Sequence, residues 1–156
     1  MKKGFALNSE NKFEIDTTPS EATETFARLA AGLSTFDPQW NEELDQTQYL
    51  DGDGFASSDV TGAQLVISYE GHRNFGDPAQ DFIAGLQPLL GEDRKTNFRW
   101  TDANGDQFSG NVTVANIVSG GGDANAKNTF SFEIHFNGKP TYTPAETTTK
   151  TGTVTP

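Results

Sequence analysis

The feature that most constrains this chain is a strict alternation of apolar and polar side chains over residues 129–136. The apolar side chains of this run are Phe130, Phe132, Ile134 and Phe136. A period of two over this length predicts a β-strand with one face in a core and the other exposed. Asn137 and Gly138 follow directly, and this pair predicts a turn where the strand ends.

Two more strands precede this one and should form an antiparallel meander with it. They cover 96–101 and 107–118, and the third strand extends over 127–136. The segment 102–106 contains an Asn-Gly pair, which is a hairpin signal. Three consecutive glycines in 120–123 suit the second connection. The C-terminal half of the chain is therefore expected to be a sheet of sequential strands.

The side chains in these strands predict which faces are buried. Phe98 and Trp100 share one face of the first strand. In the second strand, one face should carry Val112, Val114 and Val118, and the other Ala115 and Ile117. A fourth strand, earlier in the chain, should place Leu65, Ile67 and Tyr69 on one face.

One helix is predicted over 77–90. Asp77 can cap it, Pro78 suits its first position and Gly91 suits its end. Pro88 should make the last turn irregular, because proline cannot donate a backbone hydrogen bond. Its apolar stripe would consist of Phe82, Leu86, and Leu89 or Leu90.

Local signals leave the segment 19–36 open between helix and strand. Thr18 and Glu21 fit a capping box with Pro19 at the first helical position. The spacing of Phe26, Leu29, Leu33 and Phe36 fits a helix face. Several threonines and Gly32 argue against a helix, and the local balance only slightly favours one.

The composition excludes several classes of protein. The net charge is −11 and the pI about 4.4, which argues against a protein that wraps nucleic acid or binds an anionic membrane surface. The chain has no cysteine, and no run approaches a membrane span. Residues 1–10 contain two lysines but no apolar run, so we expect no secretion leader.

No motif indicates catalysis, so we expect a protein that binds and assembles rather than an enzyme. The sequence lacks a nucleophile elbow and a phosphate-binding loop. The acidic stretches 51–55 and 102–106 fail the spacing of a calcium loop and are read as turns. His72 and His135 are the only histidines, and no third metal ligand accompanies either. We therefore predict no cofactor and no metal.

Two segments look unlike a core. Residues 41–62 are read as a long acidic loop, and such loops in compact domains are usually functional or disordered. Within that loop, the apolar side chains Leu44, Tyr49, Leu50 and Phe55 would be out of place in water, so they are candidates for an assembly interface. Residues 138–156 are rich in Thr and Pro and are expected to form a flexible tail after a single domain at 1–137.

Ordered blocks of sequence resemble a known family. They comprise 41–55, Asp59-Val60-Thr61-Gly62, Gly71-His72-Arg73, 77–85, and the later runs 98–102, 120–124 and 130–134. Together they look like the major tail tube proteins of long-tailed, non-contractile bacteriophages, particularly those of Gram-positive hosts. The likeness covers about residues 23–140.

The resemblance implies a fold and a role. The fold would be mostly β, an antiparallel β-sandwich or barrel with one flanking α-helix, and the segment near 23–36 would be a strand. Copies of the chain would form hexameric rings that stack into a tube, with 41–62 reaching the next ring. DNA would pass through without specific binding, and Glu133, on a polar strand face, is a candidate for the lumen.

The resemblance also implies partners and a location. The partners would be further copies of this chain and other tail proteins, namely the tape measure, tail terminator and distal tail proteins, with no membrane involved. The protein would be made in the host bacterial cytoplasm and reside in the virion tail. Two alternatives remain: a secreted β-sandwich that binds a glycan or acts as an adhesin, using Trp40, and the inner-tube protein of a contractile, phage-like injection device.

Overall fold

The computed structural model describes residues 4–145, which form a mostly antiparallel β structure with a single α-helix, as predicted. The helical elements are η1 (Asn8–Glu10), η2 (Leu50–Gly52), α1 (Pro78–Gly85) and η3 (Gly91–Arg94). The strands are β1 (Lys12–Asp16), β2 (Phe26–Arg28), β3 (Leu33–Gln39), β4 (Glu43–Gln48), β5 (Ala56–Gly62), β6 (Val66–His72), β7 (Lys95–Thr101), β8 (Gln107–Ser119), β9 (Thr129–Phe136) and β10 (Thr141–Thr143).

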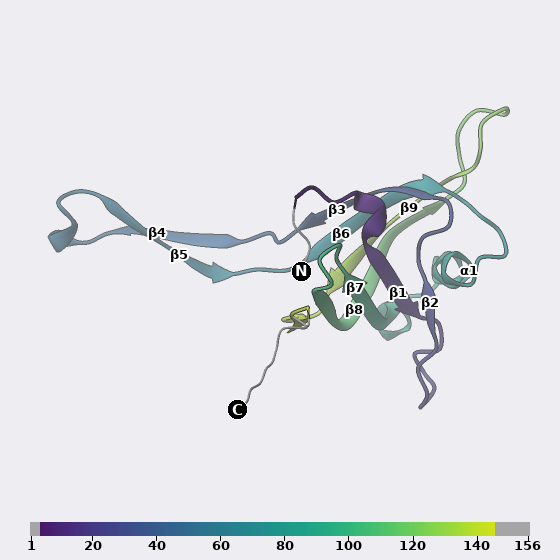
Figure 1. Cartoon of the computed structure of the whole chain (residues 1–156), viewed down its shortest axis with the longest axis horizontal. Helices are drawn as coiled ribbons and strands as arrows, with labels where there is room; N and C mark the ends of the chain where they lie inside the picture. The colour runs from purple at the N-terminus through teal and green to yellow at the C-terminus, as the bar shows by residue number, and fades with distance from the viewer. Residues whose placement is uncertain (1–3, 146–156) are drawn as a thin grey trace, which may run out of the picture.

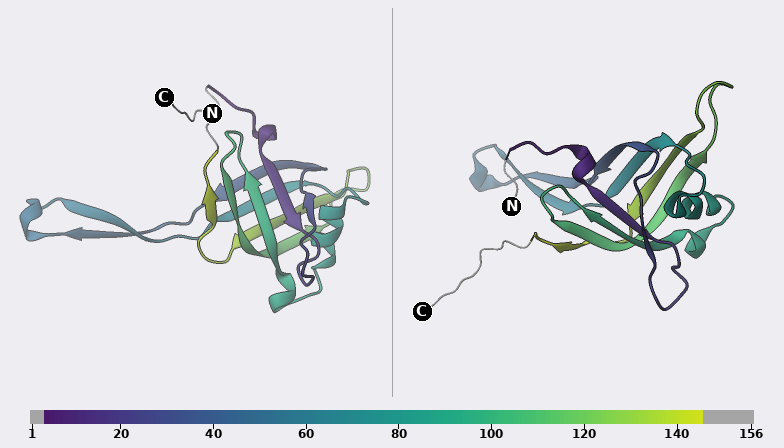
Figure 2. Two further views of the ribbon diagram at one scale, coloured as in Figure 1. Left: turned by 60° about the horizontal axis from the view of Figure 1, so that its bottom comes forward. Right: turned by 45° about the vertical axis from the view of Figure 1, so that its right-hand side comes forward.

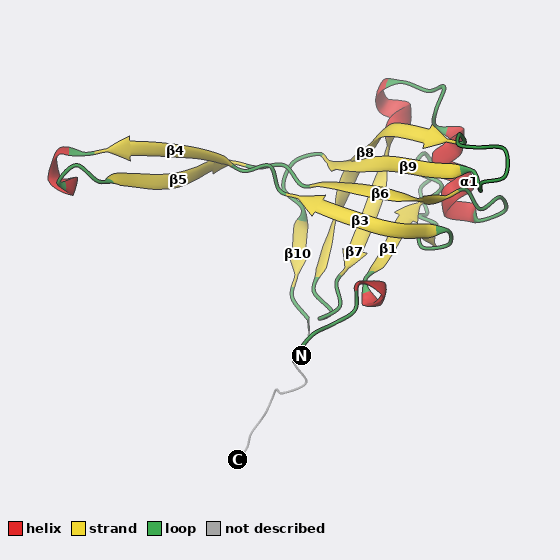
Figure 3. Ribbon diagram, turned by 90° about the horizontal axis from the view of Figure 1, so that it is seen from above, coloured by secondary structure: helices red, strands yellow, loops and turns green. Residues whose placement is uncertain are grey.

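The main sheet has the strand order β2-β1-β7-β8-β9-β6-β3, and β10 pairs with β8. The predicted meander of β7, β8 and β9 is confirmed by antiparallel registers that place Phe98 opposite Gly110 and Val114 opposite Ile134. Figure 3 shows β3, β6 and β9 crossing the direction of β1, β7 and β10, with α1 at one end. The sheet therefore folds over itself and encloses a core, with the long strand β8 belonging to both halves.

An aromatic core joins the two halves. The ring of Phe13 in β1 lies 4.9 Å from that of Phe36 in β3 and 5.1 Å from that of Tyr69 in β6, measured between centroids. Such edge-to-face pairs stabilise a core by about 0.5–1.5 kcal/mol beyond the burial of their surface. The predicted alternation in 129–136 and at 65–69 is confirmed by the fully buried side chains Leu65, Ile67, Tyr69, Phe130, Phe132, Ile134 and Phe136.

The helix α1 covers one end of the folded sheet (Figure 1). Asp77 caps it as predicted, since its carboxylate accepts a hydrogen bond of 3.1 Å from the backbone N–H of Gln80. The predicted end at residue 90 is wrong, because α1 stops at Gly85. Pro88 has no N–H to donate to the carbonyl of residue 84, and its ring restricts the residue before it. The buried stripe consists of Ala79, Ile83 and Leu86, and Phe82 packs against the core half-buried. Leu89 and Leu90 are exposed.

The segment that was open between helix and strand contains two strands, β2 and β3, as the resemblance implied. Gly32 separates them with φ +79°, and a Cβ there would collide with the carbonyl oxygen of His72. The loop before β2 is closed by Asp16, whose carboxylate accepts hydrogen bonds of 3.0 Å from the N–H groups of Thr18 and Thr25. These tertiary contacts override the local helix signals.

One predicted face of β8 is wrong. Asn116 has φ +52°, and the register with β9 slips by one residue between Ala115 and Val118. An extra residue in a strand reverses the side-chain alternation beyond it. Val118 is consequently half exposed, and Ile117 packs against the core instead.

The predicted end of the domain at residue 137 is too early. Thr141–Thr143 forms β10 on the edge of β8, and the backbone N–H of Ala145 donates a 2.8 Å hydrogen bond to Asp106. Residues 138–145 are therefore part of the fold rather than the flexible tail that was predicted. The rest of that tail, 146–156, lies outside the described residues.

Candidate functional site

The most conspicuous surface feature is a two-stranded hairpin, residues 43–62, which we call the arm. It projects away from the folded sheet in every view (Figure 2). The segment was predicted as an irregular loop, but β4 and β5 pair along it, with Leu44 opposite Val60 and Gln48 opposite Ala56. Within the described chain, the hydrogen bonds of arm residues stay inside the arm. A lone hairpin is marginally stable in water, so the arm lacks the support that neighbouring strands give the main sheet.

All four predicted interface residues lie exposed on the arm. Leu50 at the tip is fully exposed, Phe55 is 79% exposed, and Leu44 and Tyr49 are more than half exposed. Val60, which was not among the predicted residues, is 58% exposed. Its place directly across from Leu44 depends on the β4–β5 register, which only the paired structure reveals. Fully burying a side chain of the size of Leu50 or Phe55 would contribute about 1.5–3 kcal/mol each.

The tip of the arm is a tight turn with a left-handed backbone. Asp53 has φ +53° and Gly54 φ +85°. The side-chain amide of Gln48 donates a 3.1 Å hydrogen bond to the carbonyl of Gly54, which ties the tip to β4. Along the turn, the apolar residues Tyr49, Leu50 and Phe55 flank the acidic residues Asp51 and Asp53 in sequence. The tip therefore presents apolar surface in an acidic setting.

A second feature is the outward face of β3, β6, β9 and the C-terminal half of β8, which we call the acidic face. The register aligns Asp37 with Ser68 and Ser68 with Glu133 across three strands, and Glu70 lies beside them on β6. These four strands contain no Lys or Arg along their whole lengths. The acidic face is thus a continuous polar surface that carries carboxylates without compensating cations.

Glu133, the predicted lumen residue, lies on the acidic face and is about one-third exposed. Its carboxylate accepts a 2.8 Å hydrogen bond from the side-chain amide of Asn116 and lies 2.8 Å from Nε2 of His135. The hydrogen bond with His135 and then that from Asn116 lower the pKa of Glu133 below its ordinary value. The group therefore stays ionised to lower pH than a free glutamate.

The other half of the sheet has a different charge character. The strands β1, β2 and β7 contain Lys12, Arg28, Lys95 and Arg99. Arg99 lies 3.5 Å from the carboxylate of Glu14, and its guanidinium stacks 3.8 Å above the ring of Phe26. The two outward faces of the sheet thus differ in charge, so they would suit different neighbours in an assembly.

Residues 4–145 contain no group of three or more His, Asp or Glu side chains placed to hold a metal ion. No helix in this part of the chain has the length and apolar character to cross a membrane. Trp40, the candidate sugar platform, packs its ring 5.6 Å from that of Phe108 and is 38% exposed.

A folded antiparallel sheet with unpaired edge strands, a projecting arm and one acidic face defines a structural module suited to assembly. No protein-family model matches the chain, and no curated protein matches it. Solved structures do match. A chain in the tail of an empty gene transfer agent particle, solved with C6 symmetry, superposes with a TM-score of 0.72 at 16% identity, over 89% of this chain and 99% of that one.

Two more structures share the fold. A chain in the virion of a native gene transfer agent gives a TM-score of 0.70 at 15% identity, over 89% of this chain and 99% of that one. The anti-feeding prophage cap, which terminates a tube, gives 0.56 at 12% identity, over 93% of this chain and 95% of that one. The chain therefore has the fold of phage-type tail tube proteins, which confirms the predicted fold class.

Proposed function

We propose that this chain is the structural subunit of a phage tail tube, in which hexameric rings stack into a hollow conduit for DNA ejection. The observation that carries the proposal is the similarity in fold to a chain from a tail with C6 symmetry, which extends over nearly the whole length of both chains. A ring also gives the unpaired outer edges of β2 and β3 a partner, since exposed sheet edges otherwise promote uncontrolled pairing.

In this proposal the arm provides the contact between rings. Its apolar side chains Leu44, Tyr49, Leu50 and Phe55 would be removed from water by a subunit of the neighbouring ring. A hairpin whose hydrogen bonds to described residues stay within itself can adapt to that neighbour without disturbing the folded sheet. Assembly would therefore stabilise the arm, and the arm would hold successive rings together.

The acidic face is the proposed wall of the lumen, with Glu133 near its centre. A duplex that must slide through a tube should meet no cations that bind its phosphates. The absence of Lys and Arg from β3, β6, β8 and β9 meets that requirement. The hydrogen bonds that keep Glu133 ionised would maintain the repulsion over a wide pH range.

The finer assignments follow from the family resemblance. We propose that the tail is long and non-contractile, that its host is Gram-positive, and that the tape measure, terminator and distal tail proteins are neighbours of the tube. The chain would be made in the host cytoplasm and incorporated in the virion. A role in a contractile injection device is the second candidate, because the fold is shared with a cap that terminates the anti-feeding prophage tube.

Negative-stain electron microscopy of the concentrated protein, with light scattering in parallel, tests the proposal. We expect rings or hollow tubes from the unmodified chain. The double variant Leu50→Ser/Phe55→Ser should keep its unfolding midpoint but form no tubes, because only exposed side chains change. Leu90→Ser is the matched control, since Leu90 is 82% exposed but lies outside the arm. Tubes of normal length from the double variant would contradict the role of the arm.

The tube proposal itself would be contradicted if the unmodified chain remained monomeric at high concentration, both alone and with a nucleating tail extract. In that case the glycan-binding alternative would be tested next with a sugar array. Saturable binding by the monomer, lost on Trp40→Ala, would support that alternative.

A further inference from the structure

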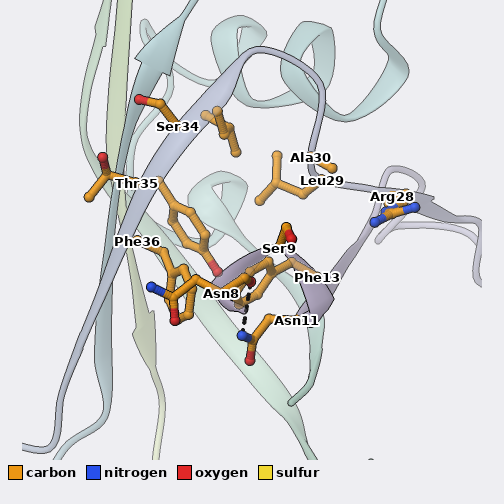
Figure 4. A pocket seen from close by; sticks show the side chains of 12 residues that line it. Asn8, Ser9, Asn11, Phe13, Arg28, Leu29, Ala30, Ser34, Thr35 and Phe36 are labelled. Atoms are coloured by element: carbon orange, nitrogen blue, oxygen red, sulfur yellow. Dashed lines mark hydrogen bonds between the residues drawn. The ribbon is translucent and has the colours of Figure 1, made fainter. Parts of the chain in front are cut away.

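A pocket of about 280 Å³ opens between η1 and β1 on one side and β3 on the other (Figure 4). We call it the seam pocket, because it lies where the two ends of the folded sheet meet without strand pairing. Its floor is apolar and its rim is polar. It is lined by Asn8, Ser9, Asn11, Phe13, Arg28, Leu29, Ala30, Leu33, Ser34, Thr35, Phe36 and Tyr69. A dry cavity of roughly 150 Å³ holds benzene, so this pocket has room for a large apolar side chain.

One residue that lines the seam pocket carries a buried polar group without a partner in the described chain. Tyr69 is 1% exposed, and its hydroxyl makes no hydrogen bond within the described chain. A buried hydroxyl without a partner costs about 1–3 kcal/mol, so such groups are usually paired. An incoming chain that offers a hydrogen-bond acceptor would satisfy this hydroxyl. The pocket is therefore incomplete in the isolated subunit.

The rim of the seam pocket carries one cationic side chain. Arg28 is the only charged residue among those that line the pocket, and it forms no ion pair with another described residue. In the adjoining hollow, Arg28 and Lys12 are offset by the carboxylates of Glu10 and Asp102. An acidic group would therefore be favoured on the pocket side of Arg28.

We infer that the seam pocket is the receptor for the arm tip of a second copy, with the Leu50 side chain entering the pocket and Asp51 next to Arg28. The inference rests on the proposed function, because it names the partner surface of the arm. The tip combines a fully exposed apolar side chain, which suits the apolar lining of the pocket, with carboxylates, which suit the cationic Arg28. The arm points away from its own sheet, so the occupant comes from another subunit (Figure 1).

Cysteine cross-linking tests the contact directly, because the chain has no cysteine of its own. Leu50→Cys protein is mixed with Ala30→Cys protein, concentrated and oxidised, and the covalent heterodimer is measured on a non-reducing gel. Disulfides require Cα atoms within about 7 Å, and each variant oxidised alone gives the background of homodimers, which have the same mass as the heterodimer. We expect Leu50→Cys to form a heterodimer with Ala30→Cys. We expect no heterodimer when Leu90→Cys replaces Ala30→Cys, because Leu90 is exposed but does not line the pocket.

Charge reversal provides a second, independent test of the same contact. Asp51→Arg in the Leu50→Cys protein, or Arg28→Asp in the Ala30→Cys protein, should each reduce the heterodimer, and the two together should restore it. Tubes that form without this cross-link would overturn the inference and leave the proposed function standing. A cross-link without tubes would support the pocket contact while the tube proposal fails. Neither tubes nor a cross-link would reject both.

Discussion

Asp45 and Asp59 are directly opposite each other in the β4–β5 register, so two carboxylates share one face of the arm. Like charges in this position destabilise a strand pair. The hydroxyl of Thr47 donates a 3.1 Å hydrogen bond to Asp45, which relieves only one of the two groups. Because Leu44 and Val60 occupy the opposite face, the arm is amphipathic, and its sequence favours contact with another surface over stability in isolation.

The first prediction concerns this acidic pair. Asp59→Asn removes one charge and should stabilise the isolated arm by about 0.2–1 kcal/mol, because it removes a cross-strand repulsion. The measurement is hydrogen exchange of the arm amides at low salt, where the variant should exchange more slowly. Asp123→Asn, an exposed change outside the arm, is the control. Equal protection in Asp59→Asn and the unmodified chain would mean that the two carboxylates do not interact.

The second prediction concerns Gly71, where β6 approaches the turn before β3. A Cβ at this position would overlap the carbonyl of Gly32 and the Cα of Leu33, both of which are backbone atoms. Gly71→Ala should therefore force the strands apart and lower the free energy of unfolding by about 1–3 kcal/mol, as overpacking does. Denaturant unfolding of the purified variant measures the change.

Gly85 is the matched control for Gly71. It lies in the last turn of α1, and a Cβ there would meet open space. Gly85→Ala should leave stability unchanged or raise it by up to about 1 kcal/mol, because alanine is the better helix former. If both variants lose stability to the same extent, steric overlap at Gly71 is not the cause.

Much of the sheet could be predicted because its signals are local. The alternation in 129–136 depends only on neighbouring residues, and the meander followed from short connections between sequential strands. The bulge at Asn116 could not be predicted, because it depends on the partner register rather than on the residue itself. The strands near 26–36 could not be predicted from local signals either. They depend on Gly32, which lies against the backbone of His72, and on hydrogen bonds from Thr18 and Thr25 to Asp16.

The candidate surfaces likewise include parts that the sequence could predict and parts that it could not. Apolar residues within an acidic segment could be recognised from sequence, so the exposed side chains Leu44, Tyr49, Leu50 and Phe55 could be named as candidates. Their arrangement on a paired hairpin could not, because an acidic, turn-rich segment has little strand propensity. The seam pocket was not predicted at all. It brings together residues from η1, β1, β3 and β6, and no sequence pattern connects them.

The third prediction concerns Tyr69, the buried hydroxyl in the seam pocket. Tyr69→Phe removes a polar atom without changing the ring contacts with Phe13 and Phe132. The isolated subunit should become more stable, by about 1 kcal/mol, because an unsatisfied buried hydroxyl is removed. If the hydroxyl gains an acceptor on assembly, tube formation should at the same time need a higher protein concentration. Thermal unfolding and the concentration dependence of light scattering measure the two effects.

Phe132 provides a control for general effects on this aromatic cluster. Phe132→Leu should lower both the stability of the subunit and its assembly, because it removes buried ring surface. Tyr69→Phe is distinguished by opposite signs for the two quantities. A variant that loses stability like Phe132→Leu would show that the hydroxyl already has a partner in the subunit.

The fourth prediction concerns pH and Glu133. Its pKa is lowered in the folded chain by the hydrogen bonds with His135 and Asn116, from an ordinary value of 4.5. A lowered pKa means that the folded state favours the ionised form, so the stabilisation is complete above about pH 4.5 and is lost as pH falls through the lower folded value. The unmodified chain should therefore lose more stability on acidification than Glu133→Gln does. Chemical unfolding at neutral pH and at pH about 3 measures the difference.

Glu70→Gln distinguishes this local effect from the general charge of the acidic face. Glu70 lies on the same face, and its carboxylate makes no hydrogen bond or ion pair within the described chain, so its removal changes the net charge equally without breaking such a contact. If Glu70→Gln and Glu133→Gln have the same pH dependence of unfolding, repulsion across the whole face dominates. If only Glu133→Gln has the smaller loss, the contacts with His135 and Asn116 keep this carboxylate ionised, as its proposed place in the lumen requires.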